Sequence, residues 1–299
     1  MKRAVSISLG SSTRDHKVIL ELLGEPISVE RIGTDGDLAR AMALYADLDG
    51  AVDAFGVGGT DLGLQVEERY YPLRAAHKMV SPVRQTPVVD GGGVRSVLER
   101  HIMQRVEAEI GDQIAPKQAM ITVAVDRYDM ALSFHHAGYQ TVYCDLMFGL
   151  GVPIAVRGLT NLQRLARFLM PVVGRLPMSV LYPTGEKQHQ IVPRYEKWYR
   201  WASVIAGDFN YIRRHLPPRL DGKVVVTNTT TAADVELLKG RGVRYLATTT
   251  PRFEGRSFGT NVIEAALTAV AGKGRTLTGD EIQGLLDRLG FRPTITRLD

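Results

Sequence analysis

The sequence contains a single cysteine, Cys144, and this scarcity excludes several classes of protein. One thiol cannot form an intrachain disulfide or a thiolate metal cluster. We expect Cys144 to behave as a small buried hydrophobic residue. His135 and His136 stand in no carboxylate–histidine pattern, so no metal site is predicted.

Long hydrophobic runs are also absent. The longest apolar stretches, such as 119–125 and 224–226, have the length of a strand, whereas a membrane-spanning helix needs about 20 residues. The amino terminus passes from Met1-Lys2-Arg3 directly into an alternating segment, without the apolar region of a signal peptide. We therefore expect a cytoplasmic protein with no membrane partner.

Basic clusters are missing although the net charge is +5. The arginines are spread along the chain, whereas a nucleic-acid groove needs a clustered basic stripe. No nucleic-acid partner is expected. A few arginines are instead expected to bind a small anionic metabolite through paired hydrogen bonds.

What the sequence does contain is an alternation of strands and helices. Apolar runs predict strands at 3–9, 26–32, 52–57, 86–89, 119–125, 141–144, 178–182, 202–205, 223–226 and 244–247. Helical spacing of apolar residues is found between many of them, most clearly over 94–110 and 159–173. This alternation predicts an α/β protein with right-handed crossovers and largely parallel sheets.

The length of 299 residues suits two domains, each with its own core. Prolines at 171 and 177 flank Gly174 and mark a linker. We predict two Rossmann-like domains with a cleft between them. Residues 1–175 would form the substrate side, and residues 176–299 the nucleotide or anion side.

Polar turns that directly follow predicted strands are the candidate site residues, because ligands collect at the carboxyl ends of parallel strands. In the first half these residues are Ser11, Ser12, Arg14, Gly58, Gly59, Thr60, Asp90, Gly91, Gly92 and Arg127. We predict that they bind the substrate. The structural alternative is that the serines, the glycines and the aspartate only cap helices and close turns.

Two threonine-rich turns are the most unusual feature of the second half. They follow the predicted strands 223–226 and 244–247 and would lie side by side if these strands are neighbours. A loop with two arginines then leads into a helix. We predict cofactor-binding residues here: Thr227, Asn228, Thr229, Thr230, Thr248, Thr249, Thr250, Arg252, Arg256 and Ser257. Threonine also favours strands, which explains part of the pattern.

The whole chain resembles the bacterial quinate 5-dehydrogenase family. The resemblance is carried by residues 226–261, by Gly58-Gly59-Thr60-Asp61 and by 88–93. It implies NAD(P)-dependent oxidation of a quinate- or shikimate-like hydroxy acid. The paired arginines fit NADP better than NAD, but both cofactors remain open. The N-V-T-x-P-x-K run of the well-studied quinate and shikimate dehydrogenases is absent.

Oxidation of an alcohol needs a proton acceptor near the hydroxyl. Lys187, Asp61 and Asp126 are the catalytic candidates. An alternative is a non-catalytic or regulatory binder of a phosphorylated or carboxylated metabolite, and a third is a transferase or lyase acting on such a metabolite. The apolar face of helix 94–110 can pack within the chain or across a homodimer.

Overall fold

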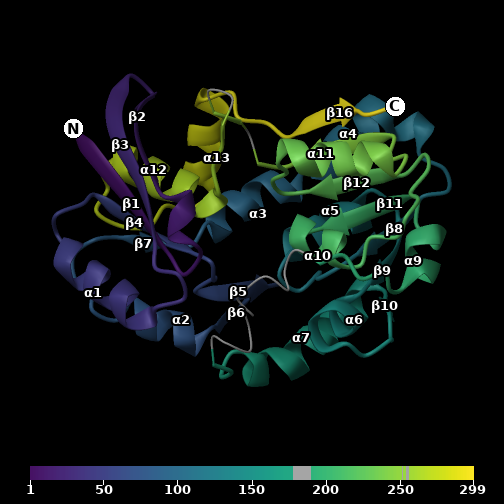
Figure 1. Ribbon diagram of the computed structural model, residues 1–299, viewed down its shortest axis with the longest axis horizontal. Coiled ribbons are helices and arrows are strands. Elements are labelled where there is room, and N and C mark those ends of the chain that lie inside the picture. Colours follow the sequence, from purple (N-terminus) through teal and green to yellow (C-terminus); the bar gives the residue numbers. More distant parts are fainter. Residues whose placement is uncertain (178–189, 251, 254–255) are drawn as a thin grey trace. The chain divides into compact units, whose positions relative to one another are not determined.

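The computed structural model describes residues 1–177, 190–250, 252–253 and 256–299 (Figure 1). These residues form two compact units. Unit 1 comprises Met1–Val97, the described part of 169–184, and Phe258–Phe291; unit 2 comprises Leu98–Phe168, the described part of 185–257, and Arg292–Asp299. The prediction of two α/β domains with largely parallel sheets is confirmed.

The units are not the successive halves 1–175 and 176–299 predicted above. In unit 2, the strand Gln118–Ile121 pairs with the strand Val204–Gly207, so one sheet contains strands from both sides of residue 175. Unit 1 in turn takes the helix Thr260–Ala271 from near the end of the chain. The prolines and the glycine near residue 175 indicate only a local interruption of regular structure. They do not indicate which strands pair with one another.

Unit 1 contains a five-stranded sheet of order β2-β3-β1-β4-β7. The strands are β1 (Lys2–Ser8), β2 (His16–Leu22), β3 (Glu25–Gly33), β4 (Ala54–Gly58) and β7 (Val88–Val89). All are parallel except β2, which pairs with β3 in an antiparallel hairpin. Its other elements are η1 (Ser12–Arg14), α1 (Leu38–Leu48), the hairpin β5 (Gly63–Val66) and β6 (Arg69–Pro72), α2 (Arg74–Met79), α12 (Thr260–Ala271) and α13 (Gly279–Arg288).

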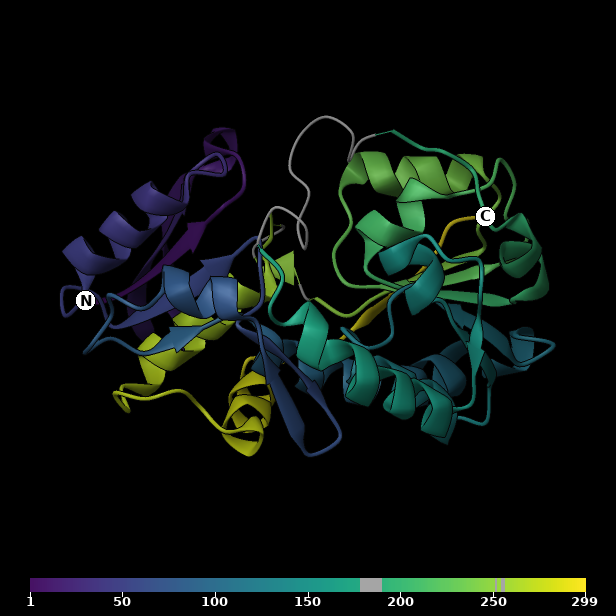
Figure 2. The ribbon, with the colours of Figure 1, turned by 90° about the horizontal axis from the view of Figure 1, so that it is seen from below.

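The alternation of β1 explains why both faces of this sheet are covered. Val5 and Ile7 belong to the apolar cluster that contains Tyr45 of α1. Ser6 points to the other face, where its Oγ accepts a hydrogen bond from Asn261 Nδ2 of α12 at 2.6 Å. Figure 2 shows the purple α1 and the yellow-green α12 on opposite sides of the purple strands.

Unit 2 contains a seven-stranded sheet of order β10-β9-β8-β11-β12-β13-β16. The strands are β8 (Gln118–Ile121), β9 (Gln140–Tyr143), β10 (Val156–Arg157), β11 (Val204–Gly207), β12 (Val224–Thr227), β13 (Tyr245–Thr248) and β16 (Thr294–Arg297). The central five are parallel, and the edge strands β10 and β16 are antiparallel.

The helices of unit 2 are α4 (Ile102–Ile110), η2 (Gly111–Gln113), α5 (Tyr128–His136), α6 (Asp145–Leu150), α9 (Glu196–Trp201), α10 (Phe209–Arg214) and α11 (Ala232–Gly240). α3 (Gly92–Arg100) and α7 (Leu159–Val173) contain residues of both units. A two-stranded hairpin is formed by β14 (Arg252–Phe253) and β15 (Arg256–Ser257).

Most predicted elements are present, with two differences among the described residues. The predicted helix 94–110 is two helices, because His101 has φ −112° and ψ 6° and interrupts the helical backbone. The predicted strand 119–125 ends at Ile121, where the chain turns into the α5 loop. The predicted strand 178–182 lies outside the described residues. Cys144 is buried as predicted, and no helix in the described parts of the chain is long and apolar enough to cross a membrane.

Candidate functional site

In the unit-2 sheet, the direction in which the chain adds new strands reverses at β8. From β8 the chain first builds β9 on one side of β8 and later adds β11, β12 and β13 on the other. Such a reversal opens a crevice outside the strand ends, which is where open α/β sheets bind ligands. The strand ends at this point are Ile121 and Gly207, followed by Thr122 and Asp208.

Thr122 and Gly207 meet at this reversal. Thr122 is fully buried, and its Oγ1 has no hydrogen-bond partner among the described residues. Gly207 has φ +129°, and a Cβ placed on it would collide with Thr122 Oγ1. Glycine is therefore required at 207 both for its backbone conformation and for the close approach of β8.

Arg127 lies beside this reversal and was predicted to bind substrate together with the first-half loops. The structure places it in unit 2, where its side chain is only 5% exposed. Its guanidinium bonds Glu99 at 2.5 Å and Asp208 at 2.7 Å. A buried guanidinium needs such partners because water is excluded. The Asp126 carboxylate lies 3.5 Å from Arg127 Nε.

A chain of hydrogen bonds extends this network to β12. Asn228 donates from Nδ2 to Asp208 Oδ2 at 2.7 Å. Thr227 Oγ1 donates to the Gly207 carbonyl at 2.7 Å. Asp208 also caps α10 through the amide of Asn210 at 2.9 Å. The network therefore fixes the ends of three neighbouring strands relative to one another.

The two threonine-rich turns lie side by side, as predicted. β12 and β13 are parallel neighbours, and Thr227 pairs with Thr248. The Thr249 amide donates to the Thr227 carbonyl at 2.9 Å. Thr230, Thr249 and Thr250 are buried, and Thr250 Oγ1 has no partner among the described residues. Thr229 is half-buried.

Several predicted residues have structural partners or fall outside the description. Thr248 Oγ1 bonds Thr294 Oγ1 of β16 at 2.7 Å. The backbones of Arg252 and Ser257 pair in the β14–β15 hairpin, with Arg256 opposite Phe253. Lys187 lies outside the described residues.

Asp145 is a further candidate site residue, which the sequence analysis did not select. It is the second residue after β9, and its Oδ1 accepts a hydrogen bond from the Val125 amide at 2.8 Å. Its Oδ2 is buried and has no partner in the described parts of the chain. Burial raises the pKa of Asp145 to about 6, against the lowering effect of the Val125 and Ala124 amides. An acidic residue after the predicted strand 141–144 was the available signal.

At the carboxyl edge of unit 1, the turn after β1 is closed by its own side chains. Ser11 Oγ accepts from the Thr13 amide at 3.2 Å and so caps η1. The Ser12 amide donates to Asp35 Oδ1 at 2.8 Å, and Arg14 is exposed. This is the capped-turn alternative. The Arg31 guanidinium of β3 also lies against the turn, where it donates to the Ser11 carbonyl at 3.0 Å and to Asp15 Oδ1 at 2.8 Å.

The glycine turn after β4 brings strands together. A Cβ on Gly58 would lie 2.7 Å from Ser8 Cβ, and Gly59 has φ +80°. Thr60 Oγ1 donates to the Asp61 carbonyl at 3.1 Å. Asp61, a predicted catalytic residue, forms an ion pair with Arg95 at 3.0 Å. The Asp61 Oδ1 atom is therefore already bound by a side chain of unit 1.

The Asp90-Gly91-Gly92 turn is also satisfied from within. Asp90 Oδ1 accepts from the Gly92 amide at 2.8 Å, and Oδ2 accepts from the Leu62 amide at 2.6 Å. Gly91 has φ +89°, and a Cβ there would collide with Asn261 and Thr260 at the start of α12. These glycines therefore serve close packing of α12.

The amino terminus of α3, which follows the predicted substrate-binding turn Asp90-Gly91-Gly92, is occupied by a side chain of the protein. Glu264 Oε2 accepts from the Val94 amide at 3.0 Å, and the Gly93 amide also bonds this carboxyl. Burial raises the pKa of Glu264 to about 7, and the Asp90 carboxylate adds to the rise. The glycine turn does bind a carboxyl group, but the group is internal.

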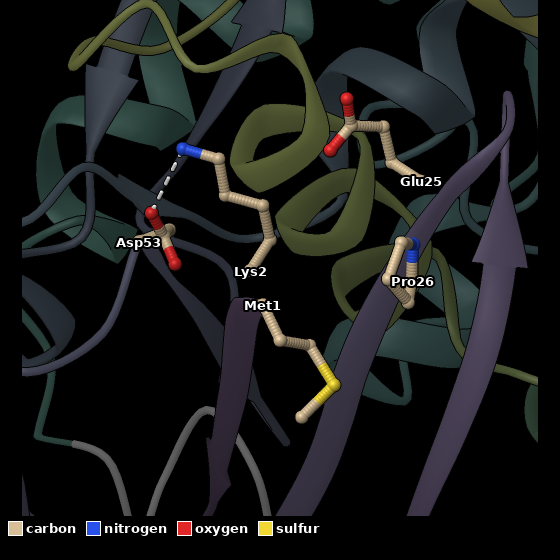
Figure 3. A pocket seen from close by; sticks show the side chains of 5 residues that line it. All are labelled: Met1, Lys2, Glu25, Pro26 and Asp53. Carbon is tan, nitrogen blue, oxygen red and sulfur yellow. Dashed lines mark hydrogen bonds and ion pairs between the residues drawn. The ribbon is translucent and has the colours of Figure 1, made fainter.

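An open pocket lies at the amino ends of β1 and β3 (Figure 3). It is lined by Met1, Lys2, Glu25, Pro26 and Asp53, and Lys2 forms an ion pair with Asp53 at 3.1 Å. Ligands of open α/β sheets bind at the opposite, carboxyl edge, so this pocket is not the candidate site. No group of three or more His, Cys, Asp or Glu side chains in the described ranges is placed to hold a metal ion.

A family profile described as Domain of unknown function (DUF8754) matches residues 93–298, which is more than half of the chain. The chain belongs to this family. A second profile, Domain of unknown function (DUF8753), matches residues 3–90. The border between the two matches, residues 90–93, falls at the start of α3. No curated protein matches the sequence.

Solved structures offer distant similarities to this DUF8754 protein. One is a malic enzyme (malate oxidoreductase), with a TM-score of 0.41, 12% identity, and coverage of 91% of this chain and 72% of that chain. The NAD-dependent malic enzyme from Thermotoga maritima has a TM-score of 0.37 and 9% identity, with coverage of 95% of this chain and 84% of that chain. GanP, a glucose-galactose binding protein from Geobacillus stearothermophilus, has a TM-score of 0.38 and 10% identity, with coverage of 99% of this chain and 97% of that chain. At these TM-scores the similarities do not bear on the function of this chain.

Proposed function

We propose that the protein is an NAD(P)-dependent oxidoreductase that holds its nucleotide at the carboxyl edge of the unit-2 sheet. The observation that carries this proposal is the strand order β10-β9-β8-β11-β12-β13, with its reversal between β8 and β11. Apart from the antiparallel β10, this is the strand order of dinucleotide-binding sheets, which bind the nucleotide at the reversal. Bound there, a nicotinamide dinucleotide would supply the hydride acceptor.

The polar groups at this edge fit a nucleotide. Thr122 and Thr250 each have a buried hydroxyl oxygen with no partner among the described residues. An unpaired buried hydroxyl costs roughly 1–3 kcal/mol, so its retention favours a missing hydrogen-bond partner. Thr229 and Asn228 lie on the next turn along the sheet. Together these residues would bind phosphate and ribose oxygens, with Arg252, Arg256 and Ser257 on the following hairpin.

For the substrate we propose a quinate- or shikimate-like hydroxy acid, as the sequence resemblance implies. Lys187 is the candidate to accept the hydroxyl proton; Asp126, which lies 3.5 Å from Arg127 at the end of the β8 loop, is assigned to the nucleotide instead. Asp61 is a weaker candidate because Arg95 already binds its carboxylate.

The test is a fluorescence titration of the full-length protein with NADH and NADPH. Trp198 and Trp201 of α9 form a T-shaped pair with ring centroids 5.9 Å apart and supply the donor emission. Saturable energy transfer at micromolar cofactor supports the proposal and is followed by assays with quinate and shikimate. No binding at millimolar cofactor overturns it.

A second candidate function is a non-catalytic binder of a phosphorylated or carboxylated metabolite. Two observations favour it: Asp61 forms an ion pair with Arg95, and Asp90 accepts hydrogen bonds from two backbone amides. Both carboxylates then have structural roles, which leaves the protein fewer groups that could accept a proton from a substrate. A thermal-shift screen of anionic metabolites tests it. A shift with such a metabolite, without dinucleotide binding, selects this function over the first.

A further inference from the structure

Asp145 occupies a defined place in the unit-2 sheet. β8 and β9 are the first two strands of this sheet in chain order, and they are parallel neighbours (Figure 1). Asp145 is the second residue after β9, and it lies 20 residues beyond Val125 of the β8 loop, whose amide it binds. In dinucleotide-binding sheets, an acidic residue about 20 residues after the first loop accepts hydrogen bonds from the ribose hydroxyls.

The carboxylate of Asp145 retains unused acceptor capacity. An ionised carboxylate can accept about four hydrogen bonds. The described residues offer it the backbone amides of Val125, Ala124 and Asp145 itself, and they leave Oδ2 without a partner. The residue as a whole is partly exposed. A ligand with two neighbouring hydroxyls would supply the hydrogen bonds that this carboxylate lacks.

The charges around Asp145 disfavour an anion at the same place. The neighbouring Asp126 carboxylate raises the pKa of Asp145 by repulsion, in addition to the larger effect of burial. Arg127, which follows Asp126 in the chain, bonds Glu99 and Asp208, and its Nε lies 3.5 Å from the Asp126 carboxylate, so its single positive charge is shared by three carboxylates. A phosphate added to the ribose 2′-oxygen would therefore meet two carboxylates.

We infer that Asp145 accepts hydrogen bonds from the ribose hydroxyls of the nucleotide and, together with Asp126, repels a 2′-phosphate, so that the protein selects NAD(H) over NADP(H). This inference rests on the proposed function, and it reverses the preference for NADP that the paired arginines suggested. Asp145 is then a specificity-determining residue.

The experiment compares NADH and NADPH in the same tryptophan titration at pH 8, where Asp145 is ionised. The wild-type protein should bind NADH at least about tenfold more tightly, because a hydrogen-bonded charge is exchanged for a charge repulsion. Asp145→Asn should weaken NADH binding and bring the two dissociation constants within about threefold of each other. Asp112→Asn, an exposed aspartate of η2 in the same unit, is the matched control and should change neither.

A competition with nucleotide fragments locates the effect at the ribose. AMP should displace NADH from the wild-type protein, whereas adenosine 2′,5′-bisphosphate should not, and Asp145→Asn should admit both. If Asp145→Asn does not fold, as judged by circular dichroism, Asp126→Asn provides the reading and should raise NADPH affinity. Equal or preferred binding of NADPH by the wild-type protein overturns the inference but leaves the proposed function standing. Failure of both dinucleotides to bind overturns both.

Discussion

Glu264 closes the amino terminus of α3 from within unit 1, with its Oε2 atom 3.0 Å from the Val94 amide nitrogen. An unoccupied helix amino terminus after a glycine turn is a ready site for phosphate. Here the carboxyl group of α12 takes that place and joins two helices that are far apart in the sequence. The same contact makes stability depend on pH.

Glu264→Gln should remove a pH dependence of folding. The pKa of Glu264 is raised from 4.5 to about 7 in the folded protein. Its contribution is therefore fully present below the unfolded pKa and is lost as pH rises through about 7, by up to about 3 kcal/mol. Thermal unfolding between pH 5 and 8 should show the variant gaining on the wild-type protein as pH rises. Glu236→Gln, on the exposed face of α11, is the control; a parallel pH profile for Glu264→Gln and wild type would contradict the prediction.

Arg127→Met should destabilise unit 2 strongly. The substitution leaves Glu99, which is 1% exposed, without its guanidinium partner. Breaking a buried ion pair by removing one partner costs about 3–5 kcal/mol, measured here by denaturant unfolding. Arg100→Ala removes an ion pair whose arginine is 59% exposed and should cost less than about 1 kcal/mol. Similar losses in the two variants would show that the Arg127 network is not the buried pair described.

Gly91→Ala should be far more harmful than Gly138→Ala. Both glycines have positive φ, +89° and +76°, so both alanines carry the same backbone strain of about 1 kcal/mol. Only at Gly91 would the added Cβ collide with the first residues of α12, because nothing lies within 4 Å of a Cβ at Gly138. Melting temperatures of the two variants measure the difference. Equal melting temperatures would mean that α12 does not pack closely on Gly91.

Thr250→Val and Thr227→Val should separate stability from binding. Thr250 Oγ1 has no partner among the described residues, so its replacement by an isosteric methyl should leave stability unchanged or raise it slightly. Thr227 Oγ1 bonds the Gly207 carbonyl, and its loss should cost about 1–3 kcal/mol. If the threonine edge binds a nucleotide, Thr250→Val should also weaken NADH binding without loss of stability. A destabilised Thr250→Val protein would contradict the assignment of that hydroxyl to a ligand.

The parts of the fold that the sequence predicted are those governed by neighbouring segments. The strands 223–226 and 244–247 are joined by one helix, and a right-handed crossover between adjacent parallel strands places Thr227 beside Thr248. The internal partner of the Asp90-Gly91-Gly92 turn could not be predicted, for the opposite reason. The Gly93 and Val94 amides bind Glu264, which lies 170 residues beyond Val94 in the chain. No pattern in the neighbouring sequence predicts this contact.

Asp145 shows a limit of a different kind. Its position after a predicted strand was visible in the sequence. Its importance depends on β9 lying beside β8 and on the Val125 amide that it binds. Both are properties of the sheet and not of the residue's neighbours in the chain.

The late position of α12 in the sequence has a consequence for synthesis of the protein. β1 and β4 leave the ribosome early, yet the helix that covers one face of their sheet begins only at Thr260. Gly56 is shaped for this helix, since a Cβ there would lie 2.8 Å from the Asn261 carbonyl oxygen. Unit 1 therefore cannot complete its core co-translationally in chain order, and nascent chains must shield an uncovered sheet face until most of the protein has been made. A fragment cut to residues 3–90 inherits that uncovered face permanently.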